Sequence, residues 1–325
     1  MKAKVFSLAL LIFIAASSLT GSAQKRKRSD FSGPTKSYSK TYPAGDDKLR
    51  IDNEYGDVTV NTWDKNEFKV DVQIKVSTHG GNDQKLLDKI SIEDKKSGNG
   101  VFFQTKADWG HTSGSQNIQI DYTVYMPAKN ALEVADDYGN IDLPDLSGKV
   151  SVNSSYGSLT AKSLSNPANS IELSYSNGTI ANLKAAKLTG EYSTITIGTA
   201  GDLTAKLDYT GLKIDNLKGT GNFNASYGHS IDIDNLSKEV KKLSLTSEYT
   251  NINIGTHGTI DANFDITIEN GKFKQEGSDI NIISTTPPTN SRGWSPTKNY
   301  KGKIGKGDAG KMITVNSSYG NVKIY

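Results

Sequence analysis

The amino-acid sequence predicts an all-β protein, a single-stranded β-solenoid in the form of a right-handed β-helix, with coils of about 18 residues. Three observations support this prediction. A tyrosine returns every 17 to 22 residues between Tyr138 and Tyr249, apolar and polar residues alternate on both sides of it, and patterns of helical period are nearly absent. A repeat of fixed length is typical of stacked architectures, in which each unit covers the apolar surface of the next.

The first 23 residues are predicted to be a secretory signal peptide. Lys2 and Lys4 precede an apolar stretch from Val5 to Ala16, and the small residues Gly21-Ser22-Ala23 follow at the cleavage positions. We therefore expect an exported protein, located in the periplasm or at the cell surface of a bacterium. No later segment approaches the ~20 apolar residues of a membrane-spanning helix, so we expect no transmembrane segment in the mature chain.

Two segments are expected between the signal peptide and the repeats. Residues 24–45 are polar and begin with a basic run, which predicts a flexible basic and polar N-terminus. Residues 46–127 carry longer alternating runs without the repeat and are predicted to form a β-rich N-terminal cap. Within the cap, only Asp83 to Lys89 is expected to form a helical turn or two.

The repeats are predicted to occupy residues 128–284. Residues 285–310 contain Pro287, Pro288 and many Gly and Lys residues, which predicts an irregular loop. Residues 311–325 return to the repeat pattern and are expected to form the terminal coil.

Each repeat tyrosine is followed by a small residue and then by two apolar residues two positions apart. The nine repeat tyrosines are Tyr55, Tyr138, Tyr156, Tyr175, Tyr192, Tyr209, Tyr227, Tyr249 and Tyr319. One interpretation is an exposed aromatic ladder that stacks on sugar rings. We favour the other, in which the tyrosines fill the corner of each coil and stack on one another, because aromatic side chains bury large areas and pair well across strands.

The alternation of apolar and polar residues assigns an orientation to each side chain of the repeats. Apolar members of a period-two pattern share the buried face, and the polar residues between them face solvent. Residues predicted to point inward include Leu159, Ile195, Leu212 and Ile252, whereas Thr160 and Lys213 are predicted to point outward. An aliphatic residue in the turn after each unit, such as Leu146 or Leu164, is expected to anchor that turn.

Composition narrows the possible functions. The chain has no cysteine and a formal net charge of +3. A secreted chain without disulfides fits a long solenoid, whose size supplies the core that small secreted domains lack. A charge this close to neutral gives no general attraction for nucleic acid, so nucleic acid is not an expected partner.

Candidate metal ligands are few, and no cofactor is expected. Asp136, Asp137, Asp232 and Asp234 lie beside turns, and Asp232 and Asp234 are predicted to share an outward face, which makes these carboxylates candidate calcium ligands. The alternative is that these carboxylates are only solvated turn residues, because no established calcium repeat is present. The four histidines are too scattered for a metal-ligand spacing.

Two longer motifs resemble a known family. With the repeated Y-G-x-V-x-V units, LRIDNEYGDVTVNTWD at residues 49–64 and IDYTVYMPAKNALEVADDYGNIDL at residues 120–143 resemble the bacterial putative adhesins, proteins of unknown function with β-strand repeats. This family is related to the head (GIN) domain of autotransporter adhesins and is common in Bacteroidetes. The resemblance covers roughly residues 40–325. It implies an exported, non-enzymatic β-solenoid and supplies no catalytic residues.

The functional expectation follows from the repeats and the resemblance together. We expect a non-enzymatic, adhesin-like or structural envelope protein that binds an envelope or extracellular polymer or protein. The alternative is a carbohydrate-active enzyme, a polysaccharide lyase or hydrolase on a β-helix scaffold, because such scaffolds also carry acidic catalytic clusters.

Overall fold

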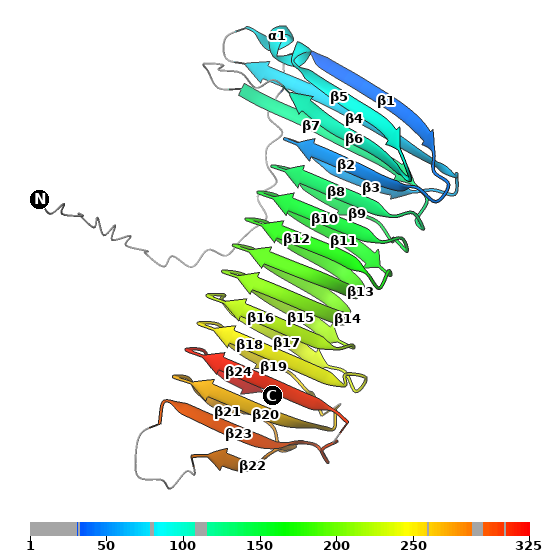
Figure 1. The fold of residues 1–325 in the computed structure, drawn as a ribbon. Coiled ribbons are helices and arrows are strands. Elements are labelled where there is room, and N and C mark those ends of the chain that lie inside the picture. The colour runs from blue at the N-terminus through cyan, green and yellow to red at the C-terminus, as the bar shows by residue number, and fades with distance from the viewer. Residues whose placement is uncertain are drawn as a thin grey trace, which may run out of the picture.

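The computed structural model describes residues 31, 33–78, 81–107, 116–258, 260–287, 295–308 and 310–325. Within them, 25 strands form a single long sheet in which most neighbouring strands run parallel, and one short helix accompanies it (Figure 1). The predicted all-β class is therefore confirmed. The signal peptide predicted over residues 1–23 lies outside the described residues. No helix in the described part of the chain is long and apolar enough to cross a membrane.

Each repeat unit places one strand before its tyrosine and one strand after it, and we call these two sets the first row and the second row. The first row contains β2 (Lys48–Glu54), β8 (Leu132–Asp137), β10 (Val150–Ser155), β12 (Asn169–Ser174), β16 (Gly221–Ser226), β18 (Lys242–Glu248) and β24 (Met312–Ser318). The second row contains β3 (Val58–Thr62), β9 (Asn140–Leu143), β11 (Ser158–Leu164), β15 (Gly211–Leu217), β17 (Ser230–Leu236), β19 (Asn251–Ile254) and β25 (Val322–Ile324). Two long strands, β13 (Asn177–Glu191) and β14 (Thr194–Asp208), belong to both rows, because each begins in the second row and ends in the first.

Neighbouring strands of each row pair in parallel, so equivalent residues of successive units lie side by side. In the first row, Val152 of β10 pairs with Val134 of β8 and with Ile171 of β12. In the second row, Leu159 of β11 pairs with Ile141 of β9. Paired strands lie about 4.8 Å apart, so each position of the repeat becomes a column of side chains running along the sheet.

The inward columns of both rows join in one continuous apolar core. The predicted orientations are confirmed for the buried residues Leu159, Ile195, Leu212 and Ile252 and for the exposed residues Thr160 and Lys213. The turn residues Leu146 and Leu164 are buried and form a parallel bridge with each other. Burial of this kind stabilises the array by roughly 1.5–3 kcal/mol for each large aliphatic side chain.

At the N-terminal end, the first repeat unit lies inside the sheet rather than at its edge. β2 pairs with β8 on one side and with β6 (Gly100–Ala107) on the other, and β3 lies between β9 and β7 (Gln116–Met126). β4 (Glu67–Thr78) and β5 (Ile90–Ser97) extend this cap by antiparallel pairing with β7 and β6. The predicted helical turn is confirmed as α1 (Asp83–Asp88), which buries Leu86 and Leu87.

Part of the predicted flexible N-terminus is instead a strand. Within residues 24–45, β1 (Thr35–Pro43) pairs with β4 along its whole length. Tyr38 and Tyr42 lie on one side of β1, where both rings contact Phe103 edge-on and both hydroxyls donate to Asp94. Polar composition concealed this strand, because its backbone ladder with β4 leaves no trace in the residue types and these two tyrosines are its main apolar contacts with the cap.

At the C-terminal end, the chain leaves the array and returns into it. β20 (Ala262–Glu269) and β21 (Phe273–Gln275) form one further unit, β23 (Thr297–Ile304) pairs antiparallel with β20, and β22 (Ile280–Thr286) pairs with β23. The final strands then enter between earlier ones: β24 lies between β18 and β20, and β25 lies between β19 and β21 (Figure 1).

Two sequence expectations are corrected by this arrangement. Residues 311–325 form an inserted unit instead of the terminal one, because β20 and β21 lie beyond them in the sheet. The irregular loop predicted over residues 285–310 contains the end of β22 and all of β23, since the open edge of β20 provides a backbone ladder for β23.

Candidate functional site: an exposed tyrosine ladder

The nine repeat tyrosines share an uncommon backbone conformation. Their φ angles lie between 50° and 66°, in the left-handed region that residues other than glycine seldom adopt. Each tyrosine opens the short turn, two or three residues long, that joins its first-row strand to its second-row strand. We call the nine residues the tyrosine ladder.

The residue after each tyrosine is small because adjacent turns approach closely. A Cβ atom on Gly139 would lie 1.8 Å from the carbonyl oxygen of Gly56, and one on Gly157 would lie 1.7 Å from that of Gly139. In the middle of the array, hydroxyl residues replace glycine and bond to the next turn. The backbone N–H of Ser176 donates to Ser193 Oγ, and the N–H of Ser193 donates to Thr210 Oγ1, each over 3.1 Å.

The tyrosine rings form one uninterrupted stack along the outside of the sheet. Adjacent ring centroids are 4.6 to 5.3 Å apart, and adjacent ring planes differ by 6° to 14°. Eight of the rings are 44–50% exposed, and Tyr55 is half-buried. The predicted mutual stacking is confirmed, but the rings do not fill an interior corner. The left-handed turn directs them outward instead.

Stacking offsets the backbone strain of the ladder. A left-handed conformation costs an L-residue roughly 1–2 kcal/mol, and an aromatic pair contributes roughly 0.5–1.5 kcal/mol beyond its buried area. Each inner ring stacks on two neighbours, so the two effects are of similar size. Stacking also turns the faces of the inner rings toward each other, which leaves mainly ring edges for an external ligand.

Carboxylates accompany the ladder along one side. Five of the nine residues that directly precede a repeat tyrosine are acidic, namely Glu54, Asp137, Glu191, Asp208 and Glu248. The Glu248 carboxylate is the main cause that raises the pKa of Tyr227. Desolvation, followed by the neighbouring Tyr209 and Tyr175, raises the pKa of Tyr192. Both phenols therefore stay protonated at neutral pH.

The structure separates the first pair of candidate calcium ligands. Asp136 points inward and is only 2% exposed, whereas Asp137 faces solvent. Asn53 Nδ2 donates to Asp136 Oδ1 over 3.0 Å, and Asp136 Oδ2 has no hydrogen-bond partner among the described residues. Burial raises the pKa of Asp136 to about 8. The sequence suggested two roles for Asp136, a calcium ligand paired with Asp137 or a solvated turn carboxylate. Its buried position fits neither role.

The second pair lies on one outward face, as predicted, but its oxygens bond to neighbouring side chains. Asp232 accepts hydrogen bonds from Ser230 Oγ at 2.5 Å and from Asn253 Nδ2 at 2.6 Å. Asp234 forms an ion pair of 2.9 Å with Lys213. Among the described residues, no three His, Cys, Asp or Glu side chains gather closely enough to hold a metal ion.

The histidines add no ligand set to these carboxylates. His229 and His257 belong to no such group, and His79 and His111 lie outside the described residues.

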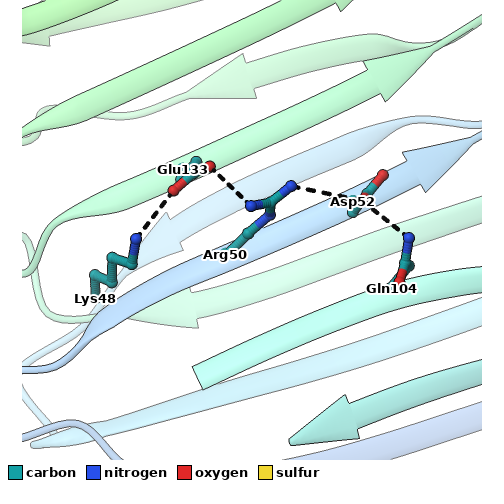
Figure 2. A network of polar contacts seen from close by, with 5 residues as sticks. All are labelled: Lys48, Arg50, Asp52, Gln104 and Glu133. Atoms are coloured by element: carbon teal, nitrogen blue, oxygen red, sulfur yellow. Dashed lines mark hydrogen bonds and ion pairs between the residues drawn. The ribbon is translucent and has the colours of Figure 1, made fainter. Parts of the chain in front are cut away.

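An ion-pair network that the sequence did not indicate crosses three strands near the N-terminal cap. Figure 2 shows Glu133 of β8 between Lys48 and Arg50 of β2, at 3.3 and 3.2 Å. Arg50 also lies 3.8 Å from Asp52, to which Gln104 of β6 donates over 3.1 Å. Exposed pairs of this kind contribute about 0–1 kcal/mol each. The network holds both carboxylates in contacts across β8, β2 and β6, and it could be recognised only once the register of these strands was known.

Comparison with known proteins identifies similar structures at low identity. A putative adhesin of Bacteroides fragilis is 10% identical with a TM-score of 0.37, and the match covers 89% of this chain and 97% of that one. A putative adhesin of Parabacteroides merdae is 12% identical with a TM-score of 0.36, covering 90% and 98%. A putative cell adhesion protein of Clostridium sporogenes is 10% identical with a TM-score of 0.23, covering 90% and 99%.

No family model and no curated protein matches the sequence. Identities and TM-scores this low leave the function to be argued from the residues of the chain itself.

Proposed function

We propose that this protein is an exported, adhesin-like binding protein that holds an envelope or extracellular polymer or protein along its length and catalyses no reaction. In this proposal the long sheet is a β-solenoid, and its coils are right-handed because crossovers between parallel strands are almost always right-handed. The periplasm or the cell surface is the proposed location, as expected from the signal peptide.

The tyrosine ladder is the observation that carries the proposal. Nine residues adopt a strained backbone conformation, and eight of them expose about half of the aromatic side chain to solvent. Residues held in strained conformations cluster at functional sites, and exposed tyrosines are common anchors at interfaces. The rungs repeat about every 5 Å along the sheet, so an extended partner can touch many equivalent rungs at once.

The shape and chemistry of the described surface favour binding over catalysis. One depression of about 400 Å³ lies over β13, β14, β16 and β18, and its lining includes no carboxylate. Another, of about 250 Å³, is lined by a single carboxylate, that of Asp142. Glycosidases generally use a pair of carboxylates on either side of the scissile bond, and neither depression offers such a pair.

A binding and turnover assay tests the proposal. Residues 24–325 are incubated with acidic and neutral polysaccharides and with envelope protein fractions, and both binding and product release are measured. The matched variant Tyr192→Asn/Tyr209→Asn removes two rungs while preserving the turn, because Asn tolerates the left-handed conformation and Asn270 adopts it after β20, with φ of 53°.

We expect weaker binding by the variant and no product release by either protein. Product release that is lost on substitution of Asp137, Asp232 or Asp234 would overturn the proposal and favour the enzyme.

A further inference from the structure

The 400 Å³ depression over β13, β14, β16 and β18 has a chemistry of its own. Its volume lies within the range of ligand sites in proteins, and it lies on the outward side of the first row, beside the ladder. The polar side chains that line it are Lys187, Thr189, Thr204, Lys206, Asn222, Asn224 and Thr246. These are two ammonium groups, three hydroxyls and two amides, and they include no negative charge.

The register places the two lysines at opposite corners of a square. Lys187 of β13 pairs with Thr204 of β14, and Thr189 of β13 pairs with Lys206 of β14. Diagonal neighbours of this kind lie about 7–8 Å apart between adjacent strands. An anionic group above the centre of the square is therefore within reach of two ammonium groups and two hydroxyls.

Both lysines are available to a ligand. Within the described part of the chain, neither Lys187 nor Lys206 has a carboxylate within ion-pair distance, whereas Lys213 pairs with both Asp215 and Asp234. Carboxylates border the depression without lining it: Glu172 of β12 pairs with Thr189, Asp202 lies two residues before Thr204, and Asp208 lies two residues after Lys206. They therefore favour an anion at the centre of the depression, between the two ammonium groups, over one at its border.

The neighbouring strands extend the site with groups that match sugar hydroxyls. Asn222 and Asn224 of β16 pair with Thr204 and Lys206, and Thr246 of β18 pairs with Asn224. Amides and hydroxyls both donate and accept hydrogen bonds, as sugar hydroxyls do. A ligand that carries hydroxyls and spaced anionic groups on one chain uses every polar side chain in the depression.

We propose that this depression is a binding site for an acidic polysaccharide, with Lys187 and Lys206 holding its anionic groups and the Asn and Thr side chains holding its hydroxyls. This inference rests on the proposed function, because it assigns a ligand class to the same outward surface.

The test compares two double variants that lose the same charge. Lys187→Gln/Lys206→Gln removes both ammonium groups of the site, and Lys184→Gln/Lys218→Gln removes two exposed lysines that do not line it. Binding of an oligogalacturonate, a heparin-derived oligosaccharide and a neutral maltooligosaccharide is measured by calorimetry at two salt concentrations. We expect the wild-type protein to bind the acidic oligosaccharides, more weakly at high salt, and the site variant to lose at least about tenfold in affinity.

The control variant should bind like the wild type. Equal losses in both variants, unchanged affinity in the site variant, or preference for the neutral oligosaccharide would each overturn this inference. Failure of this inference can be told apart from failure of the proposed function. The proposed function is tested by binding of the Tyr192→Asn/Tyr209→Asn variant and by product release, and neither measurement uses the lysine variants. Preference for the carboxylated or the sulfated probe identifies which anionic group the site holds.

Discussion

Replacing Tyr192 by alanine and by glycine separates the strain of the ladder from its stacking. Tyr192 has φ of 50° and stacks on Tyr175 at 4.8 Å and on Tyr209 at 4.6 Å. Both substitutions remove these two ring pairs, at a cost of roughly 1–3 kcal/mol in total. Alanine keeps the left-handed strain, whereas glycine releases roughly 1–2 kcal/mol of it.

The order of the two variants is the informative result. In an ordinary strand or helix, glycine is less stable than alanine by roughly 0.5–1 kcal/mol. At Tyr192 we expect this order to reverse, so that Tyr192→Gly is more stable than Tyr192→Ala by up to about 1 kcal/mol. Urea unfolding measures the difference in the free energy of unfolding, provided that its slope against urea concentration is the same in both variants.

A position of ordinary backbone provides the control. Thr196 of β14 points outward and has no positive φ, so Thr196→Ala should be more stable than Thr196→Gly. The reasoning is refuted if alanine is also the more stable residue at position 192, because the turn would then hold no strain for stacking to offset.

Three further outcomes are expected. Ile195→Asp buries an unpaired charge and should destabilise by about 3–5 kcal/mol, whereas exposed Thr194→Asp should change stability by less than about 0.5 kcal/mol in urea unfolding. Because the pKa of Asp136 is raised to about 8, the folded state binds the proton more tightly than the unfolded state, and the stability of the protein falls as pH rises from about 4 to 8. Asp136→Asn should therefore stabilise the protein by a few times ~1.4 kcal/mol at pH 8 and have little effect at pH 4. An equal effect of the substitution at both pH values would contradict this. Truncation after residue 311 removes β24 from between β18 and β20 and should lower the thermal midpoint sharply. A synthetic peptide of residues 312–325 should bind the truncated protein and restore the midpoint. Failure of the peptide to bind would show that the gap between β18 and β20 does not persist without β24.

The period of the repeat predicted local orientation well, because orientation depends only on alternation. Leu212 and Lys213 are adjacent in sequence, and one is buried and the other exposed, as alternation requires. The same rule applied from Leu132 and Val134 places Asp136 inside. That signal was present in the sequence, but the expectation that a turn carboxylate is solvated obscured it.

The order of units at the C-terminal end could not be predicted from the same pattern. In-register pairing depends on backbone spacing and apolar columns, and both are nearly alike in every unit. From the sequence, β20 and β24 are therefore equally suitable neighbours for β18. The unit of β20 and β21 was also hidden, because Asn270 occupies its tyrosine position with φ of 53°. Asn adopts the turn without the ring that marks the other units.

The regularity of the sheet determines which ligands its surface distinguishes. Parallel in-register pairing repeats each outward column at strand spacing, about 4.8 Å, so one rung of the ladder offers a ligand little that the next does not. A compact ligand meets many nearly equal positions, whereas an extended one adds contacts with every rung it covers. The square of Lys187, Thr189, Thr204 and Lys206 breaks this uniformity. Under the two proposals above, the array would combine multivalent affinity along its length with a defined register set at one charged site, and neither property requires a reaction.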